Sequence, residues 1–142
     1  MITSARNQLT GTVSAIKTGA VNDEIEITLP SGHALIATVT HSSVQYLNLH
    51  QGGEAIAFIK APWVILTAAD SGLRFSARNQ FHGTIKSVVT GAINSEVAVE
   101  IDPTLTLVSV ITNESVTGLG LKPGGAITAL IKASSIVLAT RG

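Results

Sequence analysis

The chain of 142 residues is dominated by an internal repeat. Residues 4–70 align with residues 76–142 without a gap, and more than a third of the aligned pairs are identical. The longest identical segment, SARNQ, occurs at Ser4–Gln8 and again at Ser76–Gln80. A gapless repeat indicates two copies of one structural unit. We therefore expect a first domain at residues 1–68, a connector at 69–75 and a second domain at 76–142.

Four further pairs of segments are shared by the two copies, in the same order. They are TGAVN and TGAIN at 18–22 and 90–94, THSSV and TNESV at 40–44 and 112–116, GG at 52–53 and 124–125, and IKA at 59–61 and 131–133. Between these clusters the identities fade while the apolar pattern is kept, as expected for strands that tolerate substitution.

Each copy has the pattern of short β-strands. In the first copy, apolar and polar residues alternate over 9–15 and 24–29, which is the period of a half-buried strand. Further strands are predicted at 34–39, 55–59 and 64–66, with a turn at 30–32. One short helix fits each copy. In the first copy it is capped at Thr40 or Ser42 and ends at Asn48, and in the second copy it is capped at Thr112 and ends at 118–120. The predicted fold class is all-β, with two tandem OB-like five-stranded barrels and one short helix in each.

Composition and charge exclude several classes of protein. Nine basic and nine acidic residues cancel and aromatic residues make up 4%, which is unlike the basic faces and stacking platforms of nucleic-acid binders. The chain has no cysteine, so disulfides and thiolate metal sites are excluded. No apolar run reaches the roughly 20 residues of a membrane span and no secretory leader is recognisable, so we expect a cytoplasmic protein without membrane contact. A hydrophobic content of 45% with 13% charged residues favours self-association.

The shared clusters are rich in hydrogen-bond donors and poor in acidic groups. SARNQ contains a hydroxyl, a guanidinium and two amides, and IKA adds a lysine at the end of a strand. The glycine and asparagine of TGAVN permit backbone angles that let amide N–H groups converge. Such a set of donors suits an anion. The same segments also fit plainer roles, because SARNQ can form a structural turn, TGAVN a hairpin loop and a lone lysine a solvated strand end.

No catalytic constellation is visible in the sequence. None of the four histidines is kept between the copies, and their spacing matches no zinc pattern; they are His33, His41, His50 and His82. Glu24 and Glu96 are the only carboxylates that match, and no glycine-rich phosphate loop is present. We therefore expect neither enzyme activity nor a cofactor.

Five motifs carry a resemblance to a known family. They are SARNQ, TGAVN or TGAIN, TNESV, LGLKPGG at 119–125 and ALIKASS at 129–135. Together and in this order they resemble the Mop domain of molybdate-binding proteins, and the whole chain resembles a tandem di-Mop molbindin of the ModG type. The resemblance implies OB-like five-stranded barrels, assembly as a homotrimer, and molybdate or tungstate as the bound oxyanion.

The resemblance also implies two kinds of oxyanion site. The first kind, between neighbouring domains, would use Ser4, Ala5, Arg6 and Asn7 with Lys60 and Ala61, and in the duplicate Ser76, Ala77, Arg78 and Asn79 with Lys132, Ala133 and Ser134. The second kind, at the threefold axis, would use Gly19, Ala20, Val21 and Asn22, and likewise Gly91, Ala92, Ile93 and Asn94. The helix starts at 40 and 112 are weaker candidates.

The implied function is intracellular molybdenum storage or homeostasis by reversible binding. An oxyanion-sensing regulatory subunit that acts on a separate transporter or transcription partner is the alternative, and an OB-type nucleic-acid binder is disfavoured by charge. One departure separates the two copies. Pro62 stands where the second copy has Ser134, and proline offers neither a hydroxyl nor an N–H. We therefore expect sites that use Lys60 and sites that use Lys132 to differ in affinity.

Overall fold

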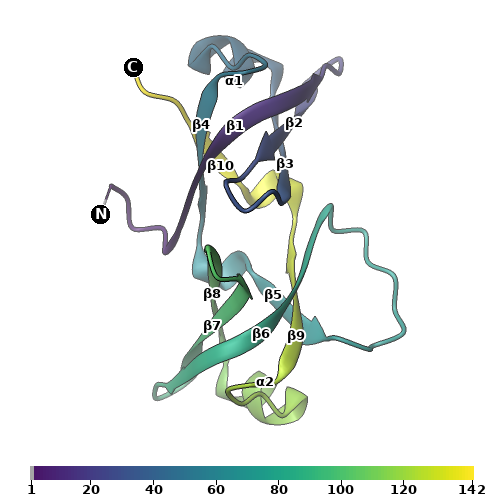
Figure 1. Ribbon diagram of the computed structural model, residues 1–142, viewed down its shortest axis with the longest axis vertical. Coiled ribbons are helices and arrows are strands. Elements are labelled where there is room, and N and C mark those ends of the chain that lie inside the picture. Colours follow the sequence, from purple (N-terminus) through teal and green to yellow (C-terminus); the bar gives the residue numbers. More distant parts are fainter. Residues whose placement is uncertain (1) are drawn as a thin grey trace. The chain divides into compact units, whose positions relative to one another are not determined.

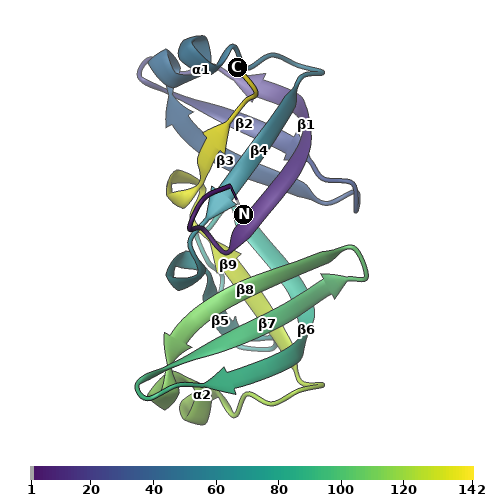
Figure 2. The ribbon, with the colours of Figure 1, turned by 90° about the vertical axis from the view of Figure 1, so that its left-hand side faces the viewer.

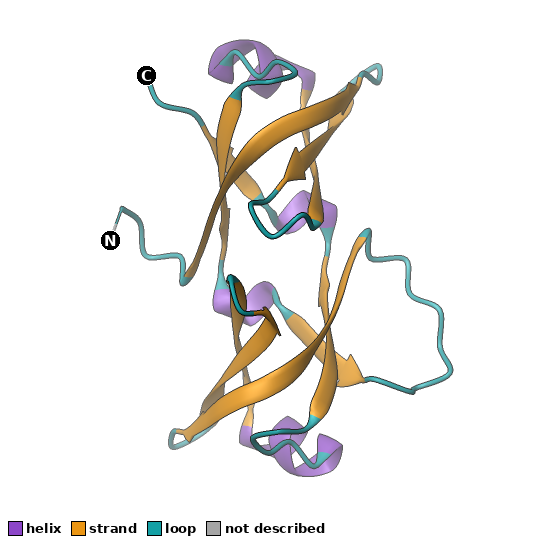
Figure 3. Ribbon diagram, in the orientation of Figure 1, coloured by secondary structure: helices purple, strands orange, loops and turns teal. Residues whose placement is uncertain are grey.

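The computed structural model describes residues 2–142 as two compact units (Figure 1). The first unit runs to Ile59 and includes Lys132–Gly142, and the second comprises Lys60–Ile131. Met1, the first residue of the predicted first domain, lies outside the described residues. Strands are the main regular structure of both units, and each unit holds one short α-helix (Figure 3).

The first unit is a five-stranded antiparallel sheet in the order β10-β4-β1-β2-β3. The two end strands, β10 and β3, also contact each other, so the sheet is curled towards a barrel, as Figure 2 shows from the side. The elements of this unit are β1 (Asn7–Lys17), β2 (Asn22–Thr28), β3 (Ala34–Thr40), α1 (His41–Leu47), β4 (Glu54–Ile59), the 3-10 turn η2 (Ala133–Ser135) and β10 (Val137–Ala139).

The second unit repeats this design in the order β5-β9-β6-β7-β8. Its end strands β5 and β8 contact each other in the same way. The elements are the 3-10 turn η1 (Ala61–Trp63), β5 (Ile65–Ala68), β6 (Asn79–Thr90), β7 (Asn94–Asp102), β8 (Leu105–Thr112), α2 (Asn113–Leu119) and β9 (Ala126–Ile131). Two curled five-stranded sheets with one short helix each confirm the predicted all-β fold class.

Each sheet takes its fifth strand from the other copy of the repeat. β5 follows the first copy of IKA and pairs with β9, whereas β10 follows the second copy and pairs with β4. In Figure 1 the yellow C-terminal strand accordingly lies among the strands of the first unit. The compact units therefore follow the exchanged strands, while the domain division at 1–68, 69–75 and 76–142 follows the repeat in the sequence and stays a prediction.

The hydrophobic core follows the predicted alternation along the central strands. In β2 the side chains of Asp23, Ile25 and Ile27 are buried, and in β7 those of Ser95, Val97 and Val99 occupy the equivalent positions. Because side chains on a strand point alternately to its two faces, one face of each sheet lines a core. The strands pair with registers that keep this face continuous.

The alternation predicted over 9–15 breaks after Val13. A β-bulge shifts the register between Val13 and Ala15, so Ala15 is exposed instead of joining the core. The second copy has the same shift between Ile85 and Ser87. A bulge inserts one extra residue and turns the following side chains to the other face.

Both predicted helices are present and capped as expected. The Thr40 hydroxyl accepts a hydrogen bond from the N–H of Ser43, and the Thr112 hydroxyl accepts one from Ser115, each at 3.1 Å. Asn48 and Gly120 end the helices in the left-handed conformation. No helix within residues 2–142 is long and apolar enough to cross a membrane.

Candidate functional site

The asparagine of SARNQ is a buried anchor in both copies. Asn7 is 3% exposed and donates its side-chain N–H to the carbonyl of Ile59 at 3.2 Å. Asn79 is 2% exposed and makes the same bond to Ile131. Ile59 and Ile131 immediately precede Lys60 and Lys132 in the chain. Each asparagine therefore fixes the end of the strand that leads into the candidate lysine.

The glutamine of SARNQ closes a turn around the preceding residues. Gln8 donates to the carbonyl of Ala5 at 3.2 Å, and Gln80 donates to the carbonyl of Ala77 at 3.1 Å. The serine and arginine side chains of both segments are exposed; they are Ser4, Arg6, Ser76 and Arg78. SARNQ is thus a structural turn that also presents a hydroxyl and a guanidinium to solvent. These two readings, which the sequence left as alternatives, are compatible.

The two candidate lysines occupy matching positions at the start of a 3-10 turn. Lys60 and Lys132 are exposed and their backbones are in the extended conformation, and the alanine that follows each of them is buried. The carbonyl of each lysine accepts a backbone hydrogen bond at 2.9 Å, from Trp63 and from Ser135 respectively. The backbones of the two segments are therefore alike.

The side chains around the two lysines differ. The ammonium of Lys60 lies 5.7 Å from the ring centroid of Trp63, within the range of a cation–π contact. The second copy has Ser135 in place of the tryptophan and Ser134 in place of Pro62. Lys60 therefore has an aromatic neighbour within its own turn, and its turn lacks the exposed hydroxyl of Ser134.

Ser134 and Asn22, which the resemblance assigns to different kinds of site, line one cavity of the first unit. The cavity has a volume of about 350 Å³ and opens beside β3, α1 and β10. Hydroxyl groups of Thr40 and Ser43 stand on its wall together with apolar side chains of β10. The second-copy residue Ser134 belongs here because its turn, η2, packs against β3.

The loops TGAVN and TGAIN are exposed at 18–22 and 90–94. Glycine is required in both, because a Cβ at Gly19 would lie 2.2 Å from the Asn22 carbonyl oxygen and one at Gly91 would lie 2.6 Å from that of Asn94. The N–H of Gly91 donates to Asn94 at 2.9 Å.

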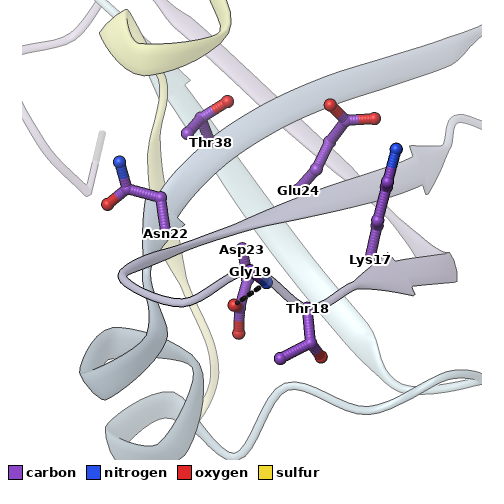
Figure 4. A pocket seen from close by; sticks show the side chains of 7 residues that line it. All are labelled: Lys17, Thr18, Gly19, Asn22, Asp23, Glu24 and Thr38. Carbon is purple, nitrogen blue, oxygen red and sulfur yellow. Dashed lines mark hydrogen bonds between the residues drawn. The ribbon is translucent and has the colours of Figure 1, made fainter.

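A buried carboxylate that the sequence reading did not single out holds the first loop. Asp23 is 1% exposed, and its Oδ1 accepts the N–H of Gly19 at 3.0 Å (Figure 4). Its Oδ2 lies 2.8 Å from Nδ1 of His41. Burial alone would raise the pKa of Asp23, but the hydrogen bonds from His41 and Gly19, together with the charge of His41, lower the pKa below its ordinary value.

The second loop is held by neutral groups at the equivalent positions. Ser95 is 1% exposed and donates its hydroxyl to Oδ1 of Asn113, whose Nδ2 donates to the carbonyl of Gly91 at 2.9 Å. The signal for this contrast was in the sequence. Asp23 and Ser95 fall in the buried phase of their strands, and His41 aligns with Asn113.

The chemistry of these segments is that of hydrogen bonding to an anion. Within residues 2–142 no group of three or more histidine, cysteine, aspartate or glutamate side chains is placed to hold a metal ion. The exposed groups of the candidate segments are hydroxyls, guanidinium and ammonium groups and backbone N–H groups. Such groups can donate hydrogen bonds to an anion.

Comparisons with known proteins agree on one family. Residues 3–66 and 76–138 each match the model of the TOBE domain. The chain also matches a solved structure described as the cytoplasmic molybdate-binding protein ModG with molybdate bound, with a TM-score of 0.95 and 48% identity over 99% of this chain and all of that chain. That match covers both compact units.

Two relatives extend the comparison. The molybdenum-pterin-binding protein MopA of Rhodobacter capsulatus is 40% identical over 98% of this chain, and the DNA-binding transcriptional dual regulator ModE of Escherichia coli K12 is 33% identical over 97%. The chain spans about half the length of these relatives, 52% of each. None of the proteins named in these comparisons is described as an enzyme, in line with the expected binding role.

Proposed function

The chain belongs to the TOBE domain family, and on that premise we propose that it binds molybdate reversibly as a tetrahedral oxyanion. The observation that carries the proposal is the doubled donor segment. Ser4 and Arg6 in one unit, and Ser76 and Arg78 in the other, are exposed on turns that a buried asparagine and a glutamine hold in the same way. The full-length similarity to a molybdate-binding protein supports the choice of anion.

Molybdate suits a site made of donors. It is a dianion without a proton at neutral pH, so each of its oxygens accepts hydrogen bonds and none donates. Phosphate is partly protonated at this pH and would bring an O–H without an acceptor. Sulfate carries no proton either, so the size of the site must select against it. Tungstate has the charge and shape of molybdate, and we propose that it binds to the same groups.

A small number of such bonds suffices energetically. Hydrogen bonds to a charged group contribute roughly 1.5–3 kcal/mol each, and micromolar affinity requires about 8 kcal/mol. Half a dozen bonds exceed this value before the costs of desolvating the dianion and ordering the loops are subtracted. Backbone N–H groups supply donors without net charge, which is consistent with the balance of acidic and basic residues.

We assign the oxyanion to two kinds of site. The residues proposed for sites between neighbouring domains are Ser4, Ala5, Arg6, Asn7, Lys60 and Ala61, and Ser76, Ala77, Arg78, Asn79, Lys132, Ala133 and Ser134. Those proposed for axial sites are Gly19, Ala20, Val21, Asn22, Gly91, Ala92, Ile93 and Asn94. The buried amides of Asn7 and Asn79 act by fixing the strand before each lysine rather than by lying open to solvent.

Assembly as a homotrimer completes the proposal. Large apolar side chains are exposed at matching positions of the two copies: Val21 and Ile93 are 71% and 75% exposed, and Ile65 and Val137 are 55% and 56% exposed. Apolar side chains repeated at equivalent surface positions favour contacts between copies of the chain. Sedimentation should give three chains per particle, and a stable monomer that binds molybdate in full would contradict the assembly.

The physiological role proposed is storage and homeostasis of molybdenum in the cytoplasm. Reversible binding without chemistry suits such a role. A regulatory subunit that senses the oxyanion is the second candidate, and the similarity to the regulator ModE favours it. A gel-shift assay with molybdate present separates the two roles. A storage protein leaves DNA unshifted with or without a DNA-binding partner protein, whereas a regulatory subunit changes the shift that its partner produces.

Calorimetric titration tests the proposed activity. Wild-type protein is titrated with molybdate, tungstate, sulfate and phosphate, and saturable heat is expected for the first two alone. Arg6→Ala and Arg78→Ala should each weaken molybdate binding by about tenfold or more, the loss of one charge-assisted bond. Arg74→Ala, an exposed arginine between the two copies, is the matched control and should bind as the wild type does. Equal heats for molybdate and sulfate would overturn the assignment.

A further inference from the structure

The two loops proposed as axial sites are held by groups of different charge. Behind the Thr18–Asn22 loop stand the carboxylate of Asp23 and the imidazole of His41, whose Oδ2 and Nδ1 atoms are 2.8 Å apart. Behind the Thr90–Asn94 loop, the same two positions hold a serine and an asparagine joined by a neutral hydrogen bond. Both pairs reach the glycine of their loop, the first through its N–H and the second through its carbonyl.

We propose that Asp23 and His41 are positioning residues that make oxyanion affinity at the Thr18–Asn22 loop dependent on pH, while the Thr90–Asn94 loop has no such dependence. The inference rests on the proposed function, since it concerns the strength of binding at one of the proposed sites. It gives a role to Asp23 and His41, neither of which is identical in the two copies.

The direction of the effect follows from the charges. With the imidazole protonated, the carboxylate of Asp23 is neutralised by its partner, and the pair adds no net charge behind the loop. With the imidazole neutral, Nδ1–H can still donate to the carboxylate, but one negative charge remains uncompensated close to a bound dianion. Histidine changes its charge between about pH 5 and about pH 8, so affinity at this loop should fall as the pH rises. By linkage, binding of the dianion at this loop takes up protons.

The carboxylate stays charged throughout this range. Burial would raise the pKa of Asp23, but the hydrogen bonds from His41 and Gly19 and the charge of His41 lower it. His41 is accessible for proton exchange, because its side chain is 44% exposed while that of Asp23 is 1% exposed. The pair therefore combines a buried carboxylate with a partly exposed imidazole.

The other charged groups near the pair come from two elements, β1 and β2. Lys17 on β1 and Glu24 on β2 line a cavity of about 230 Å³ that Asp23 also lines (Figure 4). The two residues are opposite each other in the pairing of β1 with β2. Glu26, further along β2, accepts a hydrogen bond from Ser14. On α1 the neighbours of His41 are the uncharged Gln45 and the exposed Tyr46, and β3 carries no charged residue. Lysine and glutamate ordinarily keep their charge near neutral pH, which leaves the imidazole as the group that changes.

One further lysine precedes the turn that packs on β3. Lys132 is the residue before η2, and η2 contacts β3 within the first unit. Lysine side chains ordinarily carry a positive charge near neutral pH, which adds a constant attraction for an anion. The expected pH dependence at the first loop therefore belongs to His41.

Exchange of the two pairs tests the proposal. Asp23→Ser with His41→Asn gives the first loop the groups of the second, and Ser95→Asp with Asn113→His does the reverse. Each protein is titrated with molybdate by calorimetry at about pH 6 and about pH 8, over which molybdate keeps its charge and histidine does not. Thermal unfolding of each variant establishes that it is folded, and His50→Asn, a histidine after α1, is the matched control.

In the wild type, one class of site should bind about tenfold more weakly at the higher pH, the effect of one charge near a partly exposed dianion. The first exchange should abolish that loss, the reverse exchange should add it at the second loop, and His50→Asn should retain it. Titrations in buffers of different ionisation enthalpy should show proton uptake on binding in the wild type and none from this site in the first exchange variant.

Two distinct failures can be told apart. An identical pH dependence in the wild type and in the folded Asp23→Ser, His41→Asn variant would overturn the inference while molybdate binding itself stands. The absence of saturable molybdate heat in the wild type at either pH would overturn the proposed function, and the inference with it.

Discussion

The Thr18–Asn22 loop and its counterpart at Thr90–Asn94 have the same length and the same glycine, yet different chemistry holds them. A buried carboxylate and a histidine stand behind the first loop, and a serine and an asparagine stand behind the second. The lysine turns differ in a comparable way, since Trp63 and Pro62 accompany Lys60 where serines accompany Lys132. The repeat has thus kept the backbone and the donors in both copies, while their immediate neighbours have diverged.

The largest effect is expected where the copies are alike. Asn7→Ala and Asn79→Ala each leave a strand-end carbonyl without its buried donor. Each change should lower the free energy of unfolding by about 1–3 kcal/mol, the cost of an unsatisfied buried polar group. Urea denaturation measures this value, with Gln51→Ala, an exposed amide in a turn, as the control. Markedly unequal losses for Asn7 and Asn79 would mean that the two anchors are not equivalent.

A smaller effect is expected at the lysines, where the copies differ. Lys132→Ala should weaken molybdate binding at its sites about tenfold, because in the proposed site the Lys132 ammonium and the Ser134 hydroxyl both donate to the anion. Lys60→Ala should cost less, since the ammonium of Lys60 is already held over Trp63 and Pro62 supplies no donor. Calorimetry with Lys86→Ala, an exposed lysine on β6, as the control measures both. Loss of identical numbers of equal-affinity sites in the two variants would contradict this difference.

The smallest effect is expected in the acid stability of the first unit. Since the pKa of Asp23 is lower in the folded chain than in the unfolded chain, its charge stabilises the fold above the unfolded-state pKa. That contribution should be lost as the pH falls through the folded-state value. Asp23→Ser should therefore make unfolding less sensitive to acid, whereas the wild type and Ser95→Ala should share the same sensitivity. Denaturation midpoints measured in mildly and strongly acidic buffer report it, and an unchanged acid dependence in Asp23→Ser would count against a charged, stabilising Asp23.

Much of the fold follows from local patterns. The strands and the two helices agree with periodicity and capping because alternation over a few residues, and a threonine before a short helix, are local signals. The exchange of β5 and β10 has no such signal. Both strands are short and apolar and follow the same IKA motif, so the sequence does not tell which copy of the sheet each one joins.

The residue types of the candidate site could be predicted from the sequence, but the long-range contacts that hold those residues could not. The exposed serines and arginines of SARNQ agree with a donor role, but the burial of Asn7 depends on a contact with Ile59, far along the chain. The pairing of Asp23 with His41 likewise joins β2 to α1. Neither residue is identical in the two copies, so identity between the copies singles out neither of them. An acidic residue in the buried phase of a strand, replaced together with a histidine in the other copy, is the pattern that could have revealed it.

The most direct test of the account is a crystal structure of the molybdate-loaded protein with anomalous data at the molybdenum edge. The account predicts anomalous peaks within hydrogen-bonding distance of the exposed donors of Ser4–Asn7 and Ser76–Asn79, and further peaks at the Thr18–Asn22 and Thr90–Asn94 loops. Peaks confined to other surfaces, or a fully occupied site made without these segments, would contradict it.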